Sequence, residues 1–269
     1  MTGPSAPSNL AGSDSSSARA LAFEPGITLD RVRFGYDRTR VLDGVTLDLP
    51  LGDNVVITGR NGAGKSTLLY VAAGLLRPDF GTLLLGGQRV DSMLPSERFR
   101  RGHRVGFVFQ EGGLLANLSA RDNVALPLRY HADVLGLEEA DIAARVRTAL
   151  DRVGVTAGDA RQLPAHLSVG NRKRVALARA LAVRPRYFFF DDPDVGLDPD
   201  TARLIHEILC SMRDEPQVTL VVATNRALLI ERLGVRGLRV TDGRLEDAGP
   251  LPLSSFSPPI PPPPGLPRP

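Results

Sequence analysis

Cysteine and long apolar runs are what this sequence lacks. Cys210 is the only cysteine among 269 residues, so no internal disulfide can form, and this usage fits a reducing compartment. No uninterrupted apolar run reaches the ~18 residues that a transmembrane helix needs, and the N-terminus lacks the apolar core of a secretory signal. The formal net charge of +3 argues against a chain that coats nucleic acid. We therefore expect a soluble, cytoplasmic protein that can serve a membrane only through a partner.

Composition divides the chain into three parts. Residues 1–24 are a low-complexity segment rich in serine, glycine, proline and alanine, which predicts a disordered tail. Residues 249–269 are dominated by proline, with Pro261 to Pro264 consecutive, and predict an extended tail. An SH3-type ligand is the alternative for this tail. Hydrophobic residues make up 42% of the whole chain, so we expect residues 25–248 to form a folded domain.

A glycine-rich stretch between an apolar run and a helical pattern is the strongest motif. It reads Gly59-Arg60-Asn61-Gly62-Ala63-Gly64-Lys65-Ser66-Thr67 and matches G-x-x-x-x-G-K-[ST], the phosphate-binding P-loop. The strand-like residues 55–57 precede it and the helix-like residues 68–73 follow it. Glycines let backbone N–H groups converge on a phosphate, and the helix N-terminus adds partial positive charge. Lys65 can reach the β- and γ-phosphates of ATP, and the Ser66 hydroxyl can bind Mg²⁺.

The remaining pattern is that of an α/β fold. Residues 27–34 and 45–49 alternate like strands, and residues 35–40 between them predict a turn that carries Tyr36. From about 111 to 170 the strand-like runs give way to helical spacing, which predicts a helical insertion, and a further helix is expected at 172–183. Strands and helices then alternate to about 247, which favours a parallel sheet.

A carboxylate pair follows the most apolar strand. Tyr187-Phe188-Phe189-Phe190 precedes Asp191-Asp192-Pro193, so Asp191 is expected at the carboxyl end of a buried strand, where α/β sheets bind ligands. This resembles a Walker B motif, with Asp191 placed for Mg²⁺ and Asp192 placed as a general base. The alternative is a simple strand-ending turn, which the P-loop makes less favoured.

Three further features complete an ordered set. They are Tyr36 before the P-loop, Gln110 at a strand end, and Leu167-Ser168-Val169-Gly170-Asn171 before the helix expected at 172–183. With Gly196-Leu197-Asp198 after Asp191, this order resembles the ATP-binding cassette (ABC) ATPases over about residues 27–247. The resemblance implies a mostly parallel central sheet, an N-terminal antiparallel β subdomain and an inserted helical subdomain at about 111–170.

The resemblance also implies roles for these residues. Tyr36 stacks on adenine, and Gln110 senses the metal and the γ-phosphate. Such domains work as head-to-tail pairs in which Ser168 and Gly170 of one copy contact the ATP held by the P-loop of the other. The implied ligands are ATP and Mg²⁺, with Ser66, Gln110 and Asp191 on the metal side. The implied partners are a second ATPase domain, identical or different, and integral-membrane permease subunits. We accordingly expect a peripheral protein on the cytoplasmic face of the inner membrane.

The sequence departs from the family at three places, all on the hydrolytic side. Val169 and Asn171 replace a glycine and a glutamine of the signature L-S-G-G-Q, and a β-branched residue restricts the backbone. Asp192 replaces the usual glutamate and sits about 1.5 Å further from the water, where a ~1 Å misplacement costs about a hundredfold in rate. Asn225 replaces the switch histidine and cannot carry positive charge. The hypothesis is strong ATP binding with slow hydrolysis; the alternative is compensation with ordinary turnover.

The segment after Gln110 suggests a subfamily. Residues 109–129, which include Asn123-Val124-Ala125-Leu126-Pro127-Leu128, are similar to ATPases of MCE-linked, Mla-type phospholipid transport, which implies an MCE-type periplasmic carrier as a partner. The alternative is a helical packing surface that carries no substrate information. Two other interpretations are a nucleotide-dependent regulatory or assembly subunit and the degenerate half of a heterodimeric ATPase. A third is a soluble ABC protein of DNA repair or translation, but the near-neutral net charge argues against that one.

Overall fold

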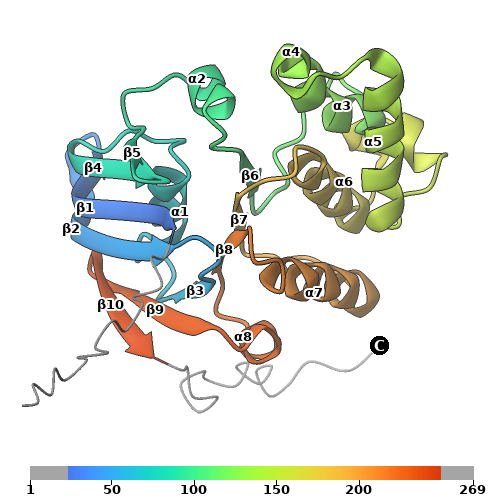
Figure 1. The fold of residues 1–269 in the computed structure, drawn as a ribbon. Coiled ribbons are helices and arrows are strands. Elements are labelled where there is room, and N and C mark those ends of the chain that lie inside the picture. Colours follow the sequence, from blue (N-terminus) through green and yellow to red (C-terminus); the bar gives the residue numbers. More distant parts are fainter. Residues whose placement is uncertain (1–23, 250–269) are drawn as a thin grey trace, which may run out of the picture.

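The computed structural model describes residues 24–249. Both predicted tails lie outside these residues, apart from Glu24 and Gly249 at their inner ends. Within the described part, two sheets and a set of helices form the α/β architecture that the sequence predicts (Figure 1). The antiparallel sheet has the order β2-β1-β4-β5, and the larger, mostly parallel sheet has the order β10-β9-β3-β8-β7-β6.

The antiparallel sheet is built on one long hairpin. Strand β1 (Pro25–Tyr36) pairs with β2 (Thr39–Pro50) and with β4 (Phe80–Leu85), and β5 (Gln88–Arg89) lies at the edge. The predicted turn over residues 35–40 is too wide, because Tyr36 still pairs with Thr39 and only two residues connect the strands. Asp37 adopts φ 50°, a conformation that aspartate tolerates well at turns.

The larger sheet holds the parallel strands expected from the alternating pattern. Its parallel members are β3 (Val55–Thr58), β6 (Val105–Val108), β7 (Tyr187–Asp191), β8 (Thr219–Ala223) and β9 (Arg236–Thr241). Strand β10 (Arg244–Gly249) pairs with β9 in antiparallel fashion at the edge. Because both faces of this sheet are covered, its central strands β3, β7 and β8 are buried at every residue and do not alternate between buried and exposed side chains.

The parallel sheet separates two apolar clusters. Phe188 and Phe190 pack into a cluster with the helices α3, α5, α6 and α7, whereas Tyr187 and Phe189 pack into a cluster with α1 and the antiparallel sheet. All four side chains are fully buried. Successive residues of a strand point to opposite faces, so this four-residue apolar run serves both clusters at once.

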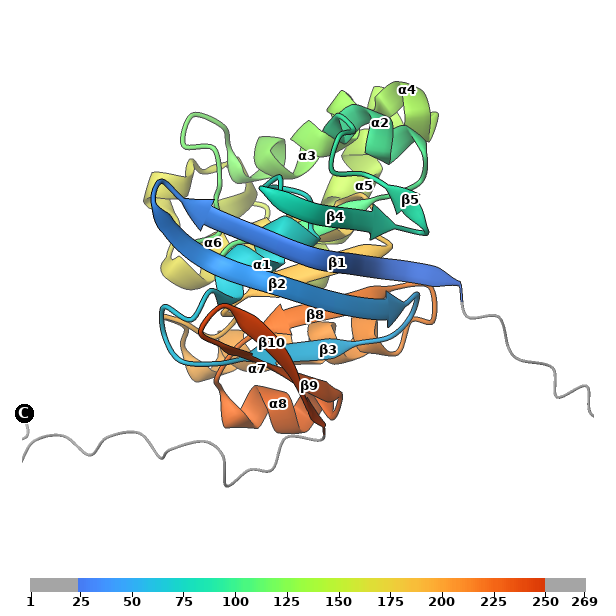
Figure 2. The same ribbon diagram turned by 90° about the vertical axis from the view of Figure 1, so that its left-hand side faces the viewer.

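The helices fall into a core group and an inserted group. Helix α1 (Lys65–Ala72) lies behind the antiparallel sheet in Figure 2, and α7 (Pro199–Arg213) and α8 (Ala227–Leu233) cover the other side of the parallel sheet. Helix α2 is a short segment at Pro95–Arg100. The inserted group has α3 (Ala120–Tyr130), α4 (Ala132–Leu135) and α5 (Glu139–Arg152), which lie with α6 (Val169–Ala182) on the side of β6 and β7 away from the antiparallel sheet (Figure 1).

The predicted start of the helix at Arg172 is wrong by one turn. Helix α6 begins at Val169 because Ser168 caps it: the Ser168 hydroxyl accepts a hydrogen bond from the Asn171 N–H at 3.1 Å. The residues that resemble the family signature therefore form the cap and first turn of α6. They are not a loop in front of the helix.

Candidate nucleotide site

The P-loop connects β3 to α1 and depends on glycine at both of its ends. Gly59 has φ 148°, and a Cβ there would lie 2.5 Å from the carbonyl oxygen of Val240 on β9. Gly64 has φ 101° and is the N-cap residue of α1. Only glycine adopts these conformations without strain. The loop therefore brings its backbone close to β9 and aims the N-terminus of α1 at the space above it.

Lys65 is the first residue of α1 and is almost fully buried. Its ammonium group donates hydrogen bonds to the carbonyl oxygens of Gly59 at 3.0 Å and Arg60 at 3.2 Å. The side chain thus folds back across the loop. This places a positive charge inside the curve of backbone that the sequence assigns to phosphate.

Ser66 and Asp191 meet across the gap between α1 and β7. The Ser66 hydroxyl donates to Asp191 Oδ1 at 3.0 Å, and the Tyr70 hydroxyl donates to Oδ2 at 3.4 Å. Burial raises the pKa of Asp191, and the two hydrogen bonds and the charges of Lys173 and Lys65 oppose that rise. Burial, with the charge of Asp191 next, raises the pKa of Tyr70 to about 12, so its hydroxyl stays a donor at neutral pH.

This pair of oxygen ligands fits a magnesium ion. Mg²⁺ prefers oxygen donors and is commonly bound by one or two protein groups together with water and substrate phosphates. A serine hydroxyl and a carboxylate that already converge at 3.0 Å match that donor set. Among residues 24–249, no cluster of three or more histidine, cysteine or acidic side chains offers an alternative site held by protein ligands alone.

Asp192 follows β7 with an unusual backbone. Its φ is 41°, in the left-handed region, and its N–H donates to the carbonyl oxygen of Ala223 at 2.9 Å. Burial and the neighbouring charge of Asp191 raise the pKa of Asp192, whereas Lys65, Lys173 and Arg226 lower it. The chain thus leaves the extended conformation of β7 directly after Asp191.

Lys173 is a buried cation that sequence reasoning missed. It is 3% exposed, and its ammonium group donates to the carbonyl oxygens of Gln110 and, at 3.2 Å, of Asp192. The same group lies over the ring of Phe190, 5.5 Å from its centre. Burial lowers the pKa of Lys173 to about 8. One side chain of α6 therefore joins the ends of β6 and β7, while the Gln110 side chain itself is exposed.

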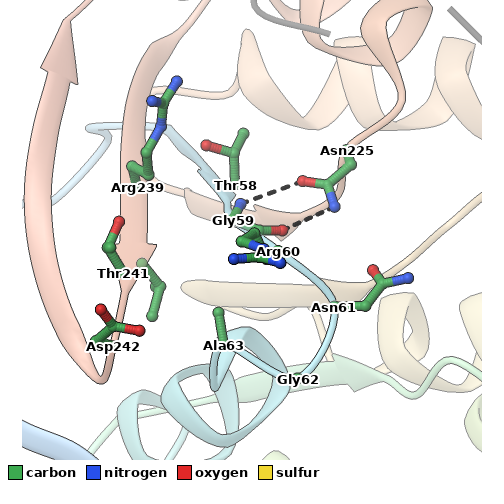
Figure 3. A pocket seen from close by; sticks show the side chains of 11 residues that line it. Thr58, Gly59, Arg60, Asn61, Gly62, Ala63, Asn225, Arg239, Thr241 and Asp242 are labelled. Atoms are coloured by element: carbon green, nitrogen blue, oxygen red, sulfur yellow. Dashed lines mark hydrogen bonds between the residues drawn. The ribbon is translucent and has the colours of Figure 1, made fainter. Parts of the chain in front are cut away.

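Asn225 fastens the end of β8 to the P-loop. Its side-chain Nδ2 donates to the Gly59 carbonyl at 2.8 Å, and its Oδ1 accepts from the Gly59 N–H at 3.2 Å, as the dashed lines in Figure 3 show. Figure 3 also shows the hollow between the loop and the β9–β10 turn, which Arg239 and Asp242 line from the far side. Its volume is about 700 Å³.

The expected signature residues have distinct environments. Val169 is 49% exposed and does not have a positive φ. Its β-branched side chain therefore does not distort the start of α6. Gly170 is buried, and a Cβ there would lie 3.1 Å from the Thr201 hydroxyl at the start of α7. A side chain at 170 would therefore require Thr201 to shift by a few tenths of an ångström. The Ser168 hydroxyl caps α6 at an exposed position.

Tyr36 lies apart from this set. It is 47% exposed at the end of β1, and its ring meets the ring of Phe34 edge-on with centroids 5.0 Å apart. It does not line the hollow beside the P-loop. Thus the structure brings together Lys65, Ser66, Asp191, Asp192 and Asn225. The roles predicted for Tyr36, Gln110 and the signature stay predictions.

Two signals could have found the missed residues. Tyr70 stands four positions after Ser66, a spacing that puts both on one helix face. Lys173 stands at the spacing of the buried stripe formed by Gly170, Leu177 and Ala180 on α6, which is an unusual place for a charge. A lysine on an apolar stripe needs a buried partner, and the carbonyl groups of two strand ends supply it.

Comparisons with known proteins agree with this geometry. The family model described as ABC transporter matches residues 42–195, so the chain belongs to the ABC transporter family of ATPases. The chain is 37% identical over 215 residues to the lipoprotein-releasing system ATP-binding protein LolD of Geobacter metallireducens, covering 78% of this chain and 92% of that one.

Two further relatives extend the comparison. The methionine import ATP-binding protein MetN of Mesorhizobium japonicum is 34% identical over 238 residues, which are 88% of this chain but only 64% of that protein. The chain thus spans less than two thirds of its length. A dimeric, post-hydrolysis structure of the ATP-binding cassette MJ0796, bound to ADP and Pi, is 28% identical with a TM-score of 0.73, covering 82% of this chain and 98% of that one. No helix within residues 24–249 is long and apolar enough to cross a bilayer.

Proposed function

We propose that this chain is the ATP-binding and ATP-hydrolysing subunit of an ABC transporter. The observation that carries the proposal is the contact of Ser66, beside the P-loop lysine, with the buried Asp191 at the end of β7. Backbone N–H groups, a cation and a metal-binding pair are the parts that a nucleoside triphosphate requires. Mg²⁺ held by Ser66 and Asp191 would neutralise charge on the β- and γ-phosphates.

Four residues of this chain would bind ATP or take part in its hydrolysis. Lys65 exchanges its bonds to the loop carbonyls for the phosphates, and Tyr36 stacks on adenine. Asp192 orients the attacking water and accepts its proton. Ser168, at the exposed N-terminus of α6, contacts the nucleotide of a second copy or of a different ATPase chain. The dimeric structures of MJ0796 support such pairing.

A permease is the partner that the surface supports. An apolar groove of about 400 Å³ lies between α2, β6, α3 and α6, and Phe99, Phe107, Leu126 and Tyr130 are among its lining residues. Leu126 and Tyr130 are 41% and 66% exposed. Exposed apolar surface of this kind marks a protein contact, and the groove begins beside the strand that leads to Gln110. The groove would receive a cytoplasmic segment of the permease.

Phospholipid is the substrate that we propose, as part of an Mla-type system that maintains outer-membrane lipid asymmetry. The support is the likeness of residues 109–129, which include all but the last residue of α3 on one side of that groove, to the ATPases of such systems. The relatives named above import methionine or release lipoproteins, so methionine and lipoproteins are the competing cargoes. No residue of this chain is expected to contact the cargo directly.

Slow hydrolysis is the second part of the proposal. The shorter carboxylate of Asp192, together with an Asn225 amide already bound to Gly59, favours a site that binds ATP tightly and turns it over slowly. The same two features favour a second candidate function, a regulatory or assembly subunit that closes on ATP without sustained turnover. The slow-hydrolysis proposal would be contradicted if the assembled complex hydrolysed ATP at a normal steady-state rate and the Asp192→Ala variant hydrolysed ATP no more slowly than wild type.

Gentle affinity purification from membranes tests the transporter assignment. Recovery of a multi-spanning permease with an MCE-type protein supports the phospholipid system, and a permease with methionine or lipoprotein components replaces it with that cargo. A second, complete ATPase would make this chain the degenerate half of a pair. If no membrane protein is recovered while equilibrium dialysis shows ATP binding that Lys65→Ala abolishes, the regulatory function replaces transport.

A further inference from the structure

A basic pocket lies at the edge of the sheet opposite the P-loop. The P-loop follows the carboxyl end of β3, whereas this pocket is formed where β6, β7 and β8 begin. Arg104 and Arg186 immediately precede β6 and β7 and line the pocket, as does Arg184 in the loop before β7, and Arg152 lines it from the end of α5. The volume is about 480 Å³, within the usual range of about 300–1,000 Å³ for small-ligand sites.

The pocket has more cations than the protein neutralises. Arg186 pairs with Glu24 at 3.0 Å, and Arg152 lies 3.8 Å from Glu215. Arg104 and Arg184 have no side-chain hydrogen bond or ion pair to any of residues 24–249. Arg145 of α5 does not line the pocket but lies near these two: burial and then the charge of Arg184 lower its pKa, Arg104 adds to this, and Asp141 opposes it. The four guanidinium groups that line the pocket thus face the two carboxylates of Glu24 and Glu215.

Two buried donors lack partners. The Nε atoms of Arg104 and Arg186 are shielded from solvent and make no hydrogen bond within the described part of the chain. Buried polar atoms without partners are rare and costly, and like charges that converge repel one another. The backbone of Arg184 also adopts a left-handed conformation, with φ 50°. An anion bound in the pocket would reduce the repulsion between the guanidinium groups and would accept hydrogen bonds from their free N–H donors.

We propose that this pocket binds a phosphate-bearing anion. The planar guanidinium fork matches phosphate oxygens in pairs of parallel hydrogen bonds. The guanidinium groups of Arg104 and Arg184, unpaired within the described residues and with Arg145 nearby, suit a ligand that carries at least two negative charges and more than two oxygen acceptors. A single carboxylate has one charge and two oxygens, so it does not meet this requirement. Leu181 and Met212 give the pocket an apolar wall for the organic part of the ligand. The ligand is either a free phosphorylated compound or the headgroup of an anionic lipid.

Titration calorimetry with inorganic pyrophosphate tests the pocket. The full chain is first saturated with Mg-ADP, so that the P-loop does not bind the probe. We expect one equivalent of pyrophosphate to bind. Arg104→Gln and Arg184→Gln should each weaken binding by about tenfold or more, because each removes a charged hydrogen bond to phosphate. The matched control is Arg147→Gln, an exposed arginine of α5 that does not line the pocket, and it should change the affinity less than twofold.

A second arm identifies the source of the phosphate. Vesicles of phosphatidic acid, a lipid whose headgroup is a terminal phosphate, are compared with vesicles of phosphatidylcholine by co-flotation. Binding to phosphatidic acid that Arg104→Gln and Arg184→Gln both remove assigns a lipid headgroup; pyrophosphate binding without vesicle binding assigns a free phosphorylated compound.

Three results would overturn the proposal. They are no pyrophosphate binding to the Mg-ADP form, binding that the two pocket variants leave unchanged, and an equal loss in Arg147→Gln, which would indicate diffuse charge attraction. If Arg104→Gln lowers the melting temperature, Arg184→Lys decides, since it keeps the charge at an exposed position but removes the fork, and it should weaken binding several-fold. The proposal does not depend on the transport function, because neither ATP turnover nor a permease enters the test.

Discussion

Lys173 should make the stability of this protein depend on pH in a defined direction. Its pKa is about 8 in the folded chain, against an ordinary value of 10.5 in the unfolded chain, because burial disfavours the charge. Between these values the unfolded chain binds more protons than the folded one. Stability should therefore rise with pH through this window, and the cost of burying the charge should be fully present below about pH 7.

The magnitude follows from the size of the shift. One pKa unit corresponds to about 1.4 kcal/mol, so the full cost is about 3 kcal/mol at neutral pH. Linkage then predicts that the wild type gains about 1 kcal/mol between pH 7 and pH 9, and about 2 kcal/mol by pH 10, relative to Lys173→Met. The comparison with Lys173→Met matters because other groups, Tyr70 among them, titrate in both proteins and cancel in the difference.

Urea unfolding at constant ionic strength measures this difference. The free energy of unfolding of wild type and Lys173→Met is determined at intervals from pH 7 to pH 10. Arg147→Gln serves as the control, because it changes an exposed side chain of α5 that does not contact Lys173, and its difference from wild type should be flat. A flat difference for Lys173→Met as well would refute the reasoning: the ammonium group would then be as well solvated in the folded chain as in the unfolded one.

Three further outcomes are expected. Asp192→Glu should raise ATP turnover in the assembled complex by up to about a hundredfold, because the longer side chain recovers the missing ~1 Å of reach; phosphate release measures it, and an unchanged rate would contradict it. Asn225→Ala should lower the free energy of unfolding by about 1–2 kcal/mol through loss of both hydrogen bonds to Gly59, whereas Asn225→His should restore a switch side chain that can carry positive charge and raise turnover. Tyr36→Ala should weaken ATP binding by about tenfold while leaving tripolyphosphate binding unchanged, and Tyr36→Phe should behave as wild type; equal losses for both ligands would exclude stacking on adenine.

Much of the fold could be predicted because local pattern and tertiary environment agree. The run Tyr187 to Phe190 predicts a strand buried on both faces, and the structure places alternate residues of that run in two different apolar clusters. The P-loop could be located because its glycines have no substitute at φ 101° and φ 148°. These are positions where one residue type alone satisfies the geometry.

The start of α6 and the extent of the β1–β2 turn could not be predicted from the same patterns. Helix α6 begins at Val169 because the Ser168 hydroxyl accepts a hydrogen bond from the Asn171 N–H. This cap outweighs the weak helix preference of valine and glycine in the first turn. Tyr36 stays in strand register because pairing with Thr39 extends the hairpin beyond its alternating segment. Both errors are at element ends, where one hydrogen bond decides the boundary and hydrophobic periodicity gives no information.

The residues of the candidate site also fall into two groups, those that a motif predicts and those that depend on packing. Lys65, Ser66 and Asp191 could be assigned from motifs, since each motif fixes a backbone and its side chain together. The hydrogen bond of Asn225 to Gly59 and that of Lys173 to the Gln110 carbonyl each join segments more than 60 positions apart in the chain. The hydrogen bond of Lys173 to the Asp192 carbonyl joins α6 to the end of β7. A sequence can place such residues on their own elements, but which carbonyl each one reaches depends on how the elements pack.

Helix α6 shows what this packing adds to the motifs. At its N-terminus Ser168 faces outward, where a second copy would hold its nucleotide, and just over one turn further on Lys173 faces inward to the ends of β6 and β7. A helix is stiff along its axis, so a displacement of its first turn also moves the Lys173 ammonium group relative to the carbonyls of Gln110 and Asp192. Each of those carbonyls belongs to the backbone of a residue that the sequence assigns to hydrolysis. A shift of α6 along its axis would therefore change the Lys173 contacts with these two carbonyls, and Lys173→Met removes both contacts.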